Sequence, residues 1–302
     1  MLEHQHKRSL QDDIERLASL LPWIGDVGLD RLHTGTLQPW IDHRRRSGIA
    51  VGTINHGMQI VRRILNLAAG EWVDEHGLTW LHAPARIKLL PNRNKRQPYP
   101  LTWDEQGRMF ALLPKQLADM ALFAVNTGCR DAEICNLRWE WRVEVPELST
   151  SVFIIPSHRV KNGDERLVVL NDVARSIVES WSGVDATYVF AYRGKPVRYM
   201  LNSGWRTARR KAGLDHVRVH DLKHTFGRRL RAAGVSFEDR QDLLGHRSTR
   251  ITSHYSAAEL TRLIESANRV CKQVVGTPEV VVLRGSLRAS RKINASTGPA
   301  FG

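Results

Sequence analysis

The stretch from His220 to Tyr255 constrains the fold of this 302-residue chain more than any other part of the sequence. It predicts two short consecutive helices, the first over residues 221–233 and ended by Gly234. Ser236 caps the second helix, which stops at Gly245. Glycine adopts the left-handed conformation that closes a helix without steric cost, so both ends are marked in the sequence.

Four side chains in this stretch are candidates for chemistry. Two histidines, His220 and His246, stand at expected helix ends, and Tyr255 follows the second by nine residues. Lys223 lies one helical turn after His220, so both can face one phosphate. An oxyanion needs hydrogen-bond donors and a weakly nucleophilic hydroxyl needs a base, so the set suits reactions at a phosphodiester.

The charge balance points to a polyanionic partner. The chain has 45 Lys and Arg against 31 Asp and Glu, a formal net charge of +14. A soluble basic protein without a polyanionic partner is the simpler alternative. An anionic membrane surface fits less well, because no basic amphipathic helix with a clean aromatic face stands out.

Targeting and redox signals favour the cytoplasm. The sequence has no run of 18 apolar residues, and residues 1–10 lack the apolar region of a secretory signal, so we expect no membrane association. Its three cysteines, Cys129, Cys135 and Cys271, are too few for a disulfide framework and fit a reducing compartment.

Residues 1–85 read as a small helical bundle with a basic face. The clearest helix is the third, where apolar residues recur at helical spacing over 54–72 while Arg62 and Arg63 lie off that stripe. The first helix is expected to be limited by Pro22. Such a bundle is a candidate DNA-binding domain.

Residues 86–100 are predicted to link two domains. They contain five Lys or Arg, three Pro and no acidic residue. The segment is either a solvated spacer or a basic linker lying along a phosphate backbone. The second interpretation makes Arg93, Lys95 and Arg96 DNA contacts.

Residues 101–270 are predicted to form a mainly helical domain with a small antiparallel sheet. Strand-like runs at 152–155 and 166–170 flank Asn162-Gly163, the strongest short hairpin signal that a sequence offers. Residues 271–302 form a C-terminal tail, which we expect to be partly disordered.

A second basic region precedes and overlaps the first of the two helices. Nine Lys or Arg stand against two acidic residues between Arg206 and Arg231. A solvated helix face usually mixes both signs, so this region favours phosphate, with Arg206, Arg209 and Arg210 as candidate contacts.

The sequence predicts neither a metal nor another cofactor. It has no D-x-D, no carboxylate cluster and no Cys/His set with zinc spacing. His220 and His224 are four residues apart on one helix, but no glutamate follows His220 and no third ligand is evident. Lys, Arg and His would then supply the electrostatic stabilisation.

These residues together resemble the tyrosine recombinases of the phage-integrase type. The family signature reads H-D-L-R-H-T, then L-L-G-H, then the tyrosine nucleophile. This chain has HDLKHT at 220–225, LLGH at 243–246 and Tyr255 after them. The resemblance covers roughly residues 7–270, and one position departs from it, because Lys223 stands where the family usually has arginine.

The resemblance implies roles for residues outside the signature. The run TGCRDAEI at 127–134 is similar to the family's first box. Its Arg130 would contact a non-bridging phosphate oxygen, and Glu133 would orient that arginine. Lys161 matches the lysine of the family's β-hairpin, which protonates the leaving 5′-oxygen.

Within the signature, the resemblance implies that His220 manages the proton of the tyrosine and that His246 donates to a phosphate oxygen. Tyr255 would be the nucleophile. Lys223 keeps the positive charge of the missing arginine but loses its planar fork, so a bidentate contact becomes a single one.

The implied fold is an α-helical N-terminal core-binding bundle followed by a mixed α+β catalytic domain. The implied function is site-specific DNA recombination, for integration or excision, through a covalent 3′-phosphotyrosyl intermediate that requires neither ATP nor metal. The expected partner is double-stranded DNA, with a homotetramer acting on two duplexes in the cytoplasm of a bacterial cell or phage-infected host, in association with the nucleoid. Many members carry a further N-terminal arm-site domain, which we expect this chain to lack.

Two alternatives remain open from the sequence. A type IB topoisomerase would share the chemistry but relax a single duplex without sequence choice. A non-catalytic DNA-binding descendant is the other alternative, and only Lys223 points to it.

Overall fold

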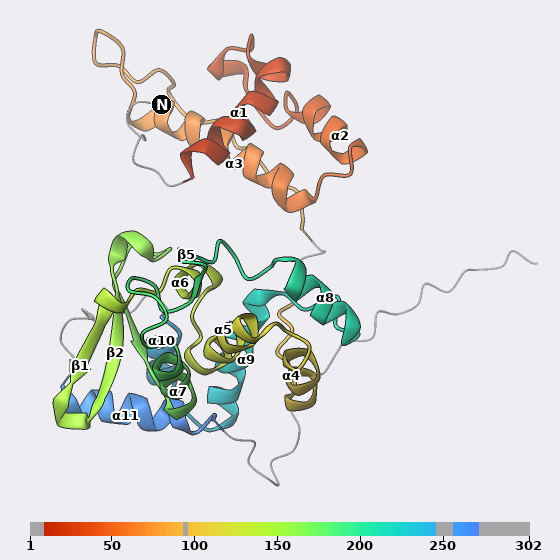
Figure 1. Ribbon diagram of the computed structural model, residues 1–302. Helices are drawn as coiled ribbons and strands as arrows, with labels where there is room; N and C mark the ends of the chain where they lie inside the picture. The colour runs from red at the N-terminus through yellow and green to blue at the C-terminus, as the bar shows by residue number, and fades with distance from the viewer. Residues whose placement is uncertain (1–8, 93–95, 246–255, 272–302) are drawn as a thin grey trace, which may run out of the picture. The chain divides into compact units, whose positions relative to one another are not determined.

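The computed structural model describes residues 9–92, 96–245 and 256–271. The chain divides into two compact units, Met1–Gln97 and Pro98–Gly302 (Figure 1). Four of the predicted site residues lie outside the described residues: Arg93, Lys95, His246 and Tyr255. The predicted C-terminal tail lies outside them too, apart from Cys271.

The first unit is a helical bundle, as predicted. Its helices are α1 Leu10–Ile24, α2 Gln38–Arg46 and α3 Val51–Gly70. Trp40 of α2 and Met58 of α3 are both buried in one apolar core. The two helices pack closely at Gly57, where an added Cβ would lie 2.6 Å from the Trp40 ring.

The prediction that Pro22 limits the first helix was wrong. Pro22 lies inside α1, which continues to Ile24. Proline lacks a backbone N–H and disrupts the turn before it, but its fixed φ is itself helical. Only two residues of α1 follow Pro22, so the disturbance is confined to the helix end.

The extended segment 84–90 is held against this bundle, although residues from 86 onward were expected to be linker. The side chain of Asn55 on α3 donates to the carbonyl oxygen of Leu90 and accepts from its N–H, both at 2.8 Å. The hydroxyl of Thr34 bonds the backbones of Arg86 and Lys88 at 3.2 and 3.1 Å. The segment therefore belongs to the first unit.

The second unit contains the remaining α-helices and the strands of the described residues. In chain order they are α4 Trp103–Phe110, α5 Lys115–Thr127, α6 Asp131–Cys135, β1 Arg142–Val145, β2 Thr150–Ile155, β3 Arg166–Val169, α7 Asp172–Ser180, β4 Ala191–Tyr192, β5 Lys195–Pro196, α8 Ser203–Lys211, α9 Val219–Ala232, α10 Phe237–Leu244 and α11 Ala257–Asn268.

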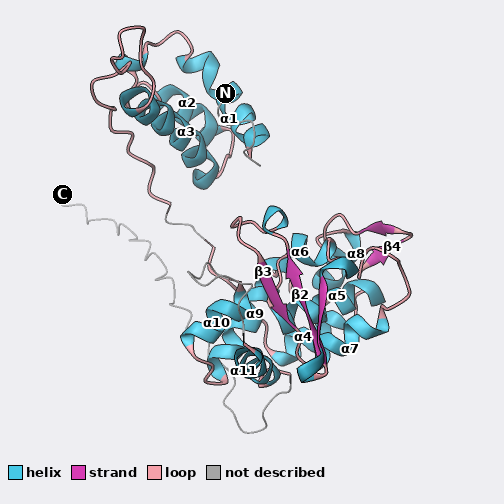
Figure 2. Cartoon of the chain, turned by 90° about the vertical axis from the view of Figure 1, so that its left-hand side faces the viewer, coloured by secondary structure: helices cyan, strands magenta, loops and turns pink. Residues whose placement is uncertain are grey.

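The sheet of three strands is antiparallel, in the order β1-β2-β3. Both faces are covered at β2 and β3. Phe153 and Val168 lie in the core around α5, whereas Val152 and Val169 lie in a second apolar cluster with residues of α9, α10 and α11 (Figure 2). A strand buried on both faces has no solvent side, which explains why every residue of β3 is buried.

The predicted hairpin forms, but its connection is longer than a two-residue turn. Ile155 pairs with Arg166, so residues 156–165 connect β2 to β3. Gly163 has φ +79° and bends the chain within this connection instead of closing the strand ladder directly. The longer loop extends Lys161 beyond the end of the sheet.

Candidate active site

A cationic pocket of about 560 Å³ opens in the second unit. Five segments line it: residues 98–100, the start of α6, the β2–β3 connection, α9 and α10. Its basic lining residues are Arg130, Lys161, His220, Lys223, His224, Arg228, Arg231 and Arg240. No carboxylate lines the pocket among the residues that the structure describes there. The pocket is therefore suited to an anion.

The turn between α5 and α6 carries Arg130 into this pocket, as the sequence predicted. Gly128 ends α5 in the left-handed conformation, with φ +62°. A Cβ at this position would lie 2.8 Å from the ring of Phe226 on α9, so the turn has no room for another side chain. Arg130 is then the N-cap residue, immediately before α6 begins at Asp131.

Glu133 holds Arg130 in place through two hydrogen bonds. Its carboxylate accepts the backbone N–H of Arg130 at 2.8 Å and the Nη1 of the same residue at 2.7 Å. It also accepts a hydrogen bond from Arg166 of β3. Burial by itself would raise the pKa of Glu133, but the charge of Arg166 and the bonds from Arg130 outweigh it and hold the pKa below its usual value. Glu133 is therefore an anion shared by two guanidinium groups.

Arg166 was missed in the sequence analysis. Its side chain is 1% exposed. Besides Glu133, it bonds the carbonyl oxygens of Thr127 at 3.3 Å and Gly128 at 3.0 Å. The available signal was an arginine opening an otherwise apolar strand, RLVVL. A charged side chain is almost never fully buried unless it is paired, so this position called for a partner.

Lys223 is 5% exposed and lies on α9 at the pocket wall. Its ammonium group donates to the carbonyl oxygen of Leu244 at the end of α10. Burial, and then the charges of Arg166 and Arg130, lower the pKa of Lys223 to about 7. The amine can therefore change its protonation state near neutral pH.

His220 also lines the pocket, and its ring meets that of His224 edge to face with centroids 4.8 Å apart. The pKa of His220 is lowered by partial desolvation first and then by the charges of His224, Lys223 and Arg130. A histidine with a lowered pKa is neutral at pH 7, so one ring nitrogen is free to accept a proton.

The other predicted site residues of the second unit lie in different surroundings. Lys161 is exposed and lines the pocket. Arg206 and Arg210 are exposed on α8, away from the described lining. Arg209 instead bonds the carbonyl oxygen of Val217 at 3.0 Å, which holds the chain that leads into α9.

Three arginines of the pocket wall were not singled out as site residues from the sequence. Arg228 and Arg231 lie on α9 and Arg240 lies on α10. Position 228 follows His224 by four residues and 231 follows Arg228 by three, so helical spacing alone placed them on one face. The orientation of α10 toward that face could be known only from the fold.

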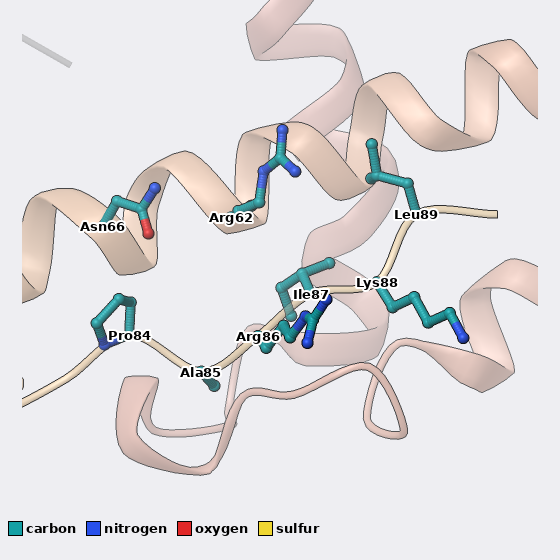
Figure 3. A pocket seen from close by; sticks show the side chains of 8 residues that line it. All are labelled: Arg62, Asn66, Pro84, Ala85, Arg86, Ile87, Lys88 and Leu89. Atoms are coloured by element: carbon teal, nitrogen blue, oxygen red, sulfur yellow. The ribbon is translucent and has the colours of Figure 1, made fainter.

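A second basic surface lies within the first unit, in a cavity of about 490 Å³. Figure 3 shows Arg62 and Asn66 on α3, alongside the extended segment that carries Arg86 and Lys88. Ile87, between these two, is buried in the bundle, so the basic side chains alternate outward. This set of Arg62, Asn66, Arg86 and Lys88 is called the first-unit groove below.

Nowhere in the described part of the chain do three or more His, Cys, Asp or Glu side chains form a group able to hold a metal ion. None of the helices within the described ranges has the length and apolar character needed to cross a membrane.

Solved structures share this fold. A Tn1549 transposon integrase in complex with transposon right end DNA aligns with a TM-score of 0.58 and 15% identity, over 87% of this chain and 96% of that one. A lambda integrase tetramer bound to a Holliday junction aligns with a TM-score of 0.57 and 17% identity, over 83% and 74%. These likenesses confirm the predicted fold class of N-terminal helices followed by a mainly helical domain with a small sheet.

Sequence comparisons identify the family to which the chain belongs. The integrase of Salmonella phage P22 is 26% identical over 89% of this chain and 76% of its own length. The tyrosine recombinase XerC of Rhodospirillum centenum is 29% identical over 80% and 72%. The family model described as "Phage integrase family" matches residues 102–262, more than half of the chain. The match covers every basic residue of the pocket lining and the HDLKHT and LLGH runs, and this chain therefore belongs to the phage integrase family, the enzyme family of the tyrosine recombinases.

Proposed function

We propose that this chain is a site-specific DNA recombinase that breaks and rejoins DNA through Tyr255, for integration or excision. The observation that carries the proposal is the convergence of Arg130, Lys161, His220 and Lys223 on one pocket without a described carboxylate. These four side chains come from three separate regions of the chain. Arg130, Lys161 and His220 match residues of the family pattern, whereas Lys223 stands where the family usually has arginine.

The chemistry follows from these groups. The phenol oxygen of Tyr255 attacks the scissile phosphorus, and its proton passes to a neutral histidine, for which His220 is the described candidate. Arg130 and Lys223 neutralise the charge that accumulates on the non-bridging oxygens of the five-coordinate phosphorus. The bond from phosphorus to the 5′-oxygen breaks, and Lys161 gives that oxygen a proton.

The product is a 3′-phosphotyrosyl bond that conserves the phosphodiester. A 5′-hydroxyl of a partner strand then attacks it, which releases Tyr255 and reseals the DNA. Bonds formed and broken balance in each half of the reaction, so the chemistry needs no ATP. The charge stabilisation can come from fixed cations alone, and we propose a metal-free reaction with His246 as a further donor to the phosphate.

The substrate is double-stranded DNA. Both basic surfaces support this: the pocket of the second unit and the first-unit groove each present Lys or Arg to solvent. A solved relative of the same fold is a tetramer bound to a Holliday junction. We propose the same assembly here, with four protomers on two duplexes, acting in the cytoplasm where the DNA of the cell lies.

A suicide substrate tests the proposal. A duplex carrying a core site with a nick next to the scissile phosphate loses the short 5′-hydroxyl strand after cleavage and traps the enzyme covalently. The wild-type chain should give a denaturation-resistant protein–DNA adduct, whereas Tyr255→Phe should not. Tyr192→Phe is the matched control, because Tyr192 is an exposed tyrosine outside the described lining of the pocket.

The same assay separates the alternatives. A non-catalytic binder would shift the DNA but form no adduct. An enzyme that forms the adduct is then given two sites on separate duplexes. Exchange of strands between them supports a recombinase, whereas relaxation of supercoiled DNA without exchange would show a topoisomerase.

A further inference from the structure

Arg166 joins three segments that build the pocket. It stands on β3, at the end of the connection that carries Lys161. Its guanidinium bonds Glu133 and the carbonyl oxygens of Thr127 and Gly128, at the turn that carries Arg130. The guanidinium of Arg166 also lies close to the end of α10, because a Cβ on Gly245 would lie 2.7 Å from Nε of Arg166.

A buried guanidinium of this kind is costly unless it is paired and hydrogen-bonded. Arg166 is paired with the Glu133 carboxylate of α6 and donates to the carbonyl oxygens of Thr127 and Gly128 where α5 ends, while its Nε is buried without a hydrogen-bond partner among the described residues. The planar fork of arginine reaches several acceptors in fixed directions, which a lysine cannot do. The contacts therefore fix the position of the turn relative to β3.

The Glu133 carboxylate transmits this constraint to the pocket. One of its oxygens, Oε1, accepts Nη1 of Arg130 at 2.7 Å, while the other accepts Arg166. Arg130 is 19% exposed and faces the pocket, and Arg166 is buried behind the carboxylate. Removing Arg166 leaves a buried carboxylate with one cation fewer, which favours its protonation. A protonated Glu133 holds the Arg130 guanidinium less firmly.

We propose that Arg166 is a positioning residue for DNA cleavage: acting through Glu133, it holds the guanidinium of Arg130 in the geometry that the scissile phosphate requires. This inference rests on the proposed function. It extends that function to a buried residue outside the described pocket lining.

The test measures cleavage of DNA that is already bound. The suicide substrate is mixed with saturating enzyme, and the rate of adduct formation is followed in a single turnover, with the dissociation constant measured separately. Arg166→Met should lower the cleavage rate by on the order of 10²-fold, the effect of losing one oriented oxyanion donor. The dissociation constant should change by less than about threefold, since Arg166 is buried. Arg166→Lys keeps the charge without the fork and should fall between Arg166→Met and wild type.

Arg229→Met is the matched control for a stability effect. Arg229 is a partly buried arginine of α9 that bonds Gln106 at 2.9 Å and stacks 3.4 Å over the ring of Trp103, outside the described lining of the pocket. Its loss should lower the melting temperature and leave the cleavage rate of bound DNA within about twofold of wild type. An equal loss of rate in both variants would overturn the positioning role.

A second pair of variants keeps the test decisive if Arg166→Met does not fold. Glu133→Gln with Arg166→Met removes both charges of the buried pair, so no unpaired ion remains in the core. If Arg166 acts through Glu133, the double variant should cleave at the same reduced rate as Glu133→Gln alone. A further loss of tenfold or more in the double variant would contradict the inference.

The proposed function and this inference fail in different ways. Absence of any adduct from the wild-type chain would refute the proposed function. A wild-type adduct together with an unchanged rate in Arg166→Met would refute only the role of Arg166.

Discussion

The ammonium group of Lys223 donates a hydrogen bond to the carbonyl oxygen of Leu244, the last residue of α10. The final carbonyl groups of a helix lack intrahelical partners and carry partial negative charge, so a cation there is stabilising. The bond joins α9, which carries His220, to the residue that precedes Gly245-His246. Lys223 therefore has a structural contact in addition to its position in the pocket.

Replacing Lys223 tests whether it performs the work of the arginine that the family usually has. Lys223→Ala should lower the cleavage rate by about 10²–10³-fold, as for the loss of one oxyanion donor. Lys223→Arg should keep the rate or raise it, because the fork offers a second hydrogen bond to the phosphate. Both variants should bind DNA almost normally, and adduct formation on the suicide substrate measures the rate.

The opposite result would transfer the role to another arginine. Arg228 lies one residue beyond a full turn from Lys223 and lines the same pocket. If Lys223→Ala cleaves at the wild-type rate while Arg228→Ala does not, Arg228 is the second phosphate contact.

The pH dependence of cleavage should report the titration of Lys223. Its pKa is lowered to about 7 in the free protein, first by burial and then by Arg166 and Arg130. The protonated amine is the form that neutralises the phosphate, so the second-order cleavage rate at limiting DNA should fall as pH rises through this value. Lys223→Arg should remove that fall, because guanidinium stays charged. A wild-type profile that stays flat from pH 6 to 9 would contradict this assignment.

The pH dependence of the free energy of unfolding should also report the titration of Lys223. The folded-state pKa of Lys223 lies at about 7, below the ordinary value of a lysine. Between that value and about pH 10, the unfolded chain binds more protons at this site, so its contribution to the free energy of unfolding rises with pH. Urea unfolding of wild type and Lys223→Met should show wild type gaining relative to the variant from pH 7 to pH 9. If the difference in the free energy of unfolding between the two proteins stayed constant over this pH range, Lys223 would have the ordinary pKa of a lysine in the folded protein.

Tyr255→Phe should abolish the covalent adduct and leave the dissociation constant nearly unchanged. The substitution removes one hydroxyl and no charge, whereas binding depends on many cations. Gel shift and denaturing electrophoresis on the same sample measure the two quantities. An adduct at the wild-type level would exclude Tyr255 as the nucleophile.

DNA affinity should fall steeply with salt. Neutralising about six phosphates gives a log–log slope near −5, at roughly 0.9 per phosphate. Arg62→Ala and Arg86→Ala in the first-unit groove should each make the slope shallower by roughly 0.9 and weaken binding across sequences. Arg16→Ala is the control, because Arg16 is paired with Asp12 and Asp13 on α1. A wild-type slope shallower than about −2 would show that these basic residues are solvated.

Short-range patterns in the sequence determined several parts of the site. His220, Lys223 and His224 share a face because the helix repeats every 3.6 residues, and the structure places all three on the pocket wall. Gly128 ends α5 and sets Arg130 at the start of α6, as expected, because the left-handed turn needs a residue without a Cβ. Such features depend on neighbours within a few residues, which is the range over which sequence patterns are informative.

The tertiary structure decided what lies between these segments. Nothing near Arg166 in the chain shows that its partner is Glu133, 33 residues earlier, because the contact depends on how β3 packs against the α5–α6 turn. The same holds for the bond between Lys223 and Leu244 and for the segment 84–90, which Asn55 and Thr34 hold on the first unit. The sequence determined which side chains are cations, whereas long-range packing decided which of them are buried, paired or left facing the pocket, since burial and pairing depend on segments far apart in the chain.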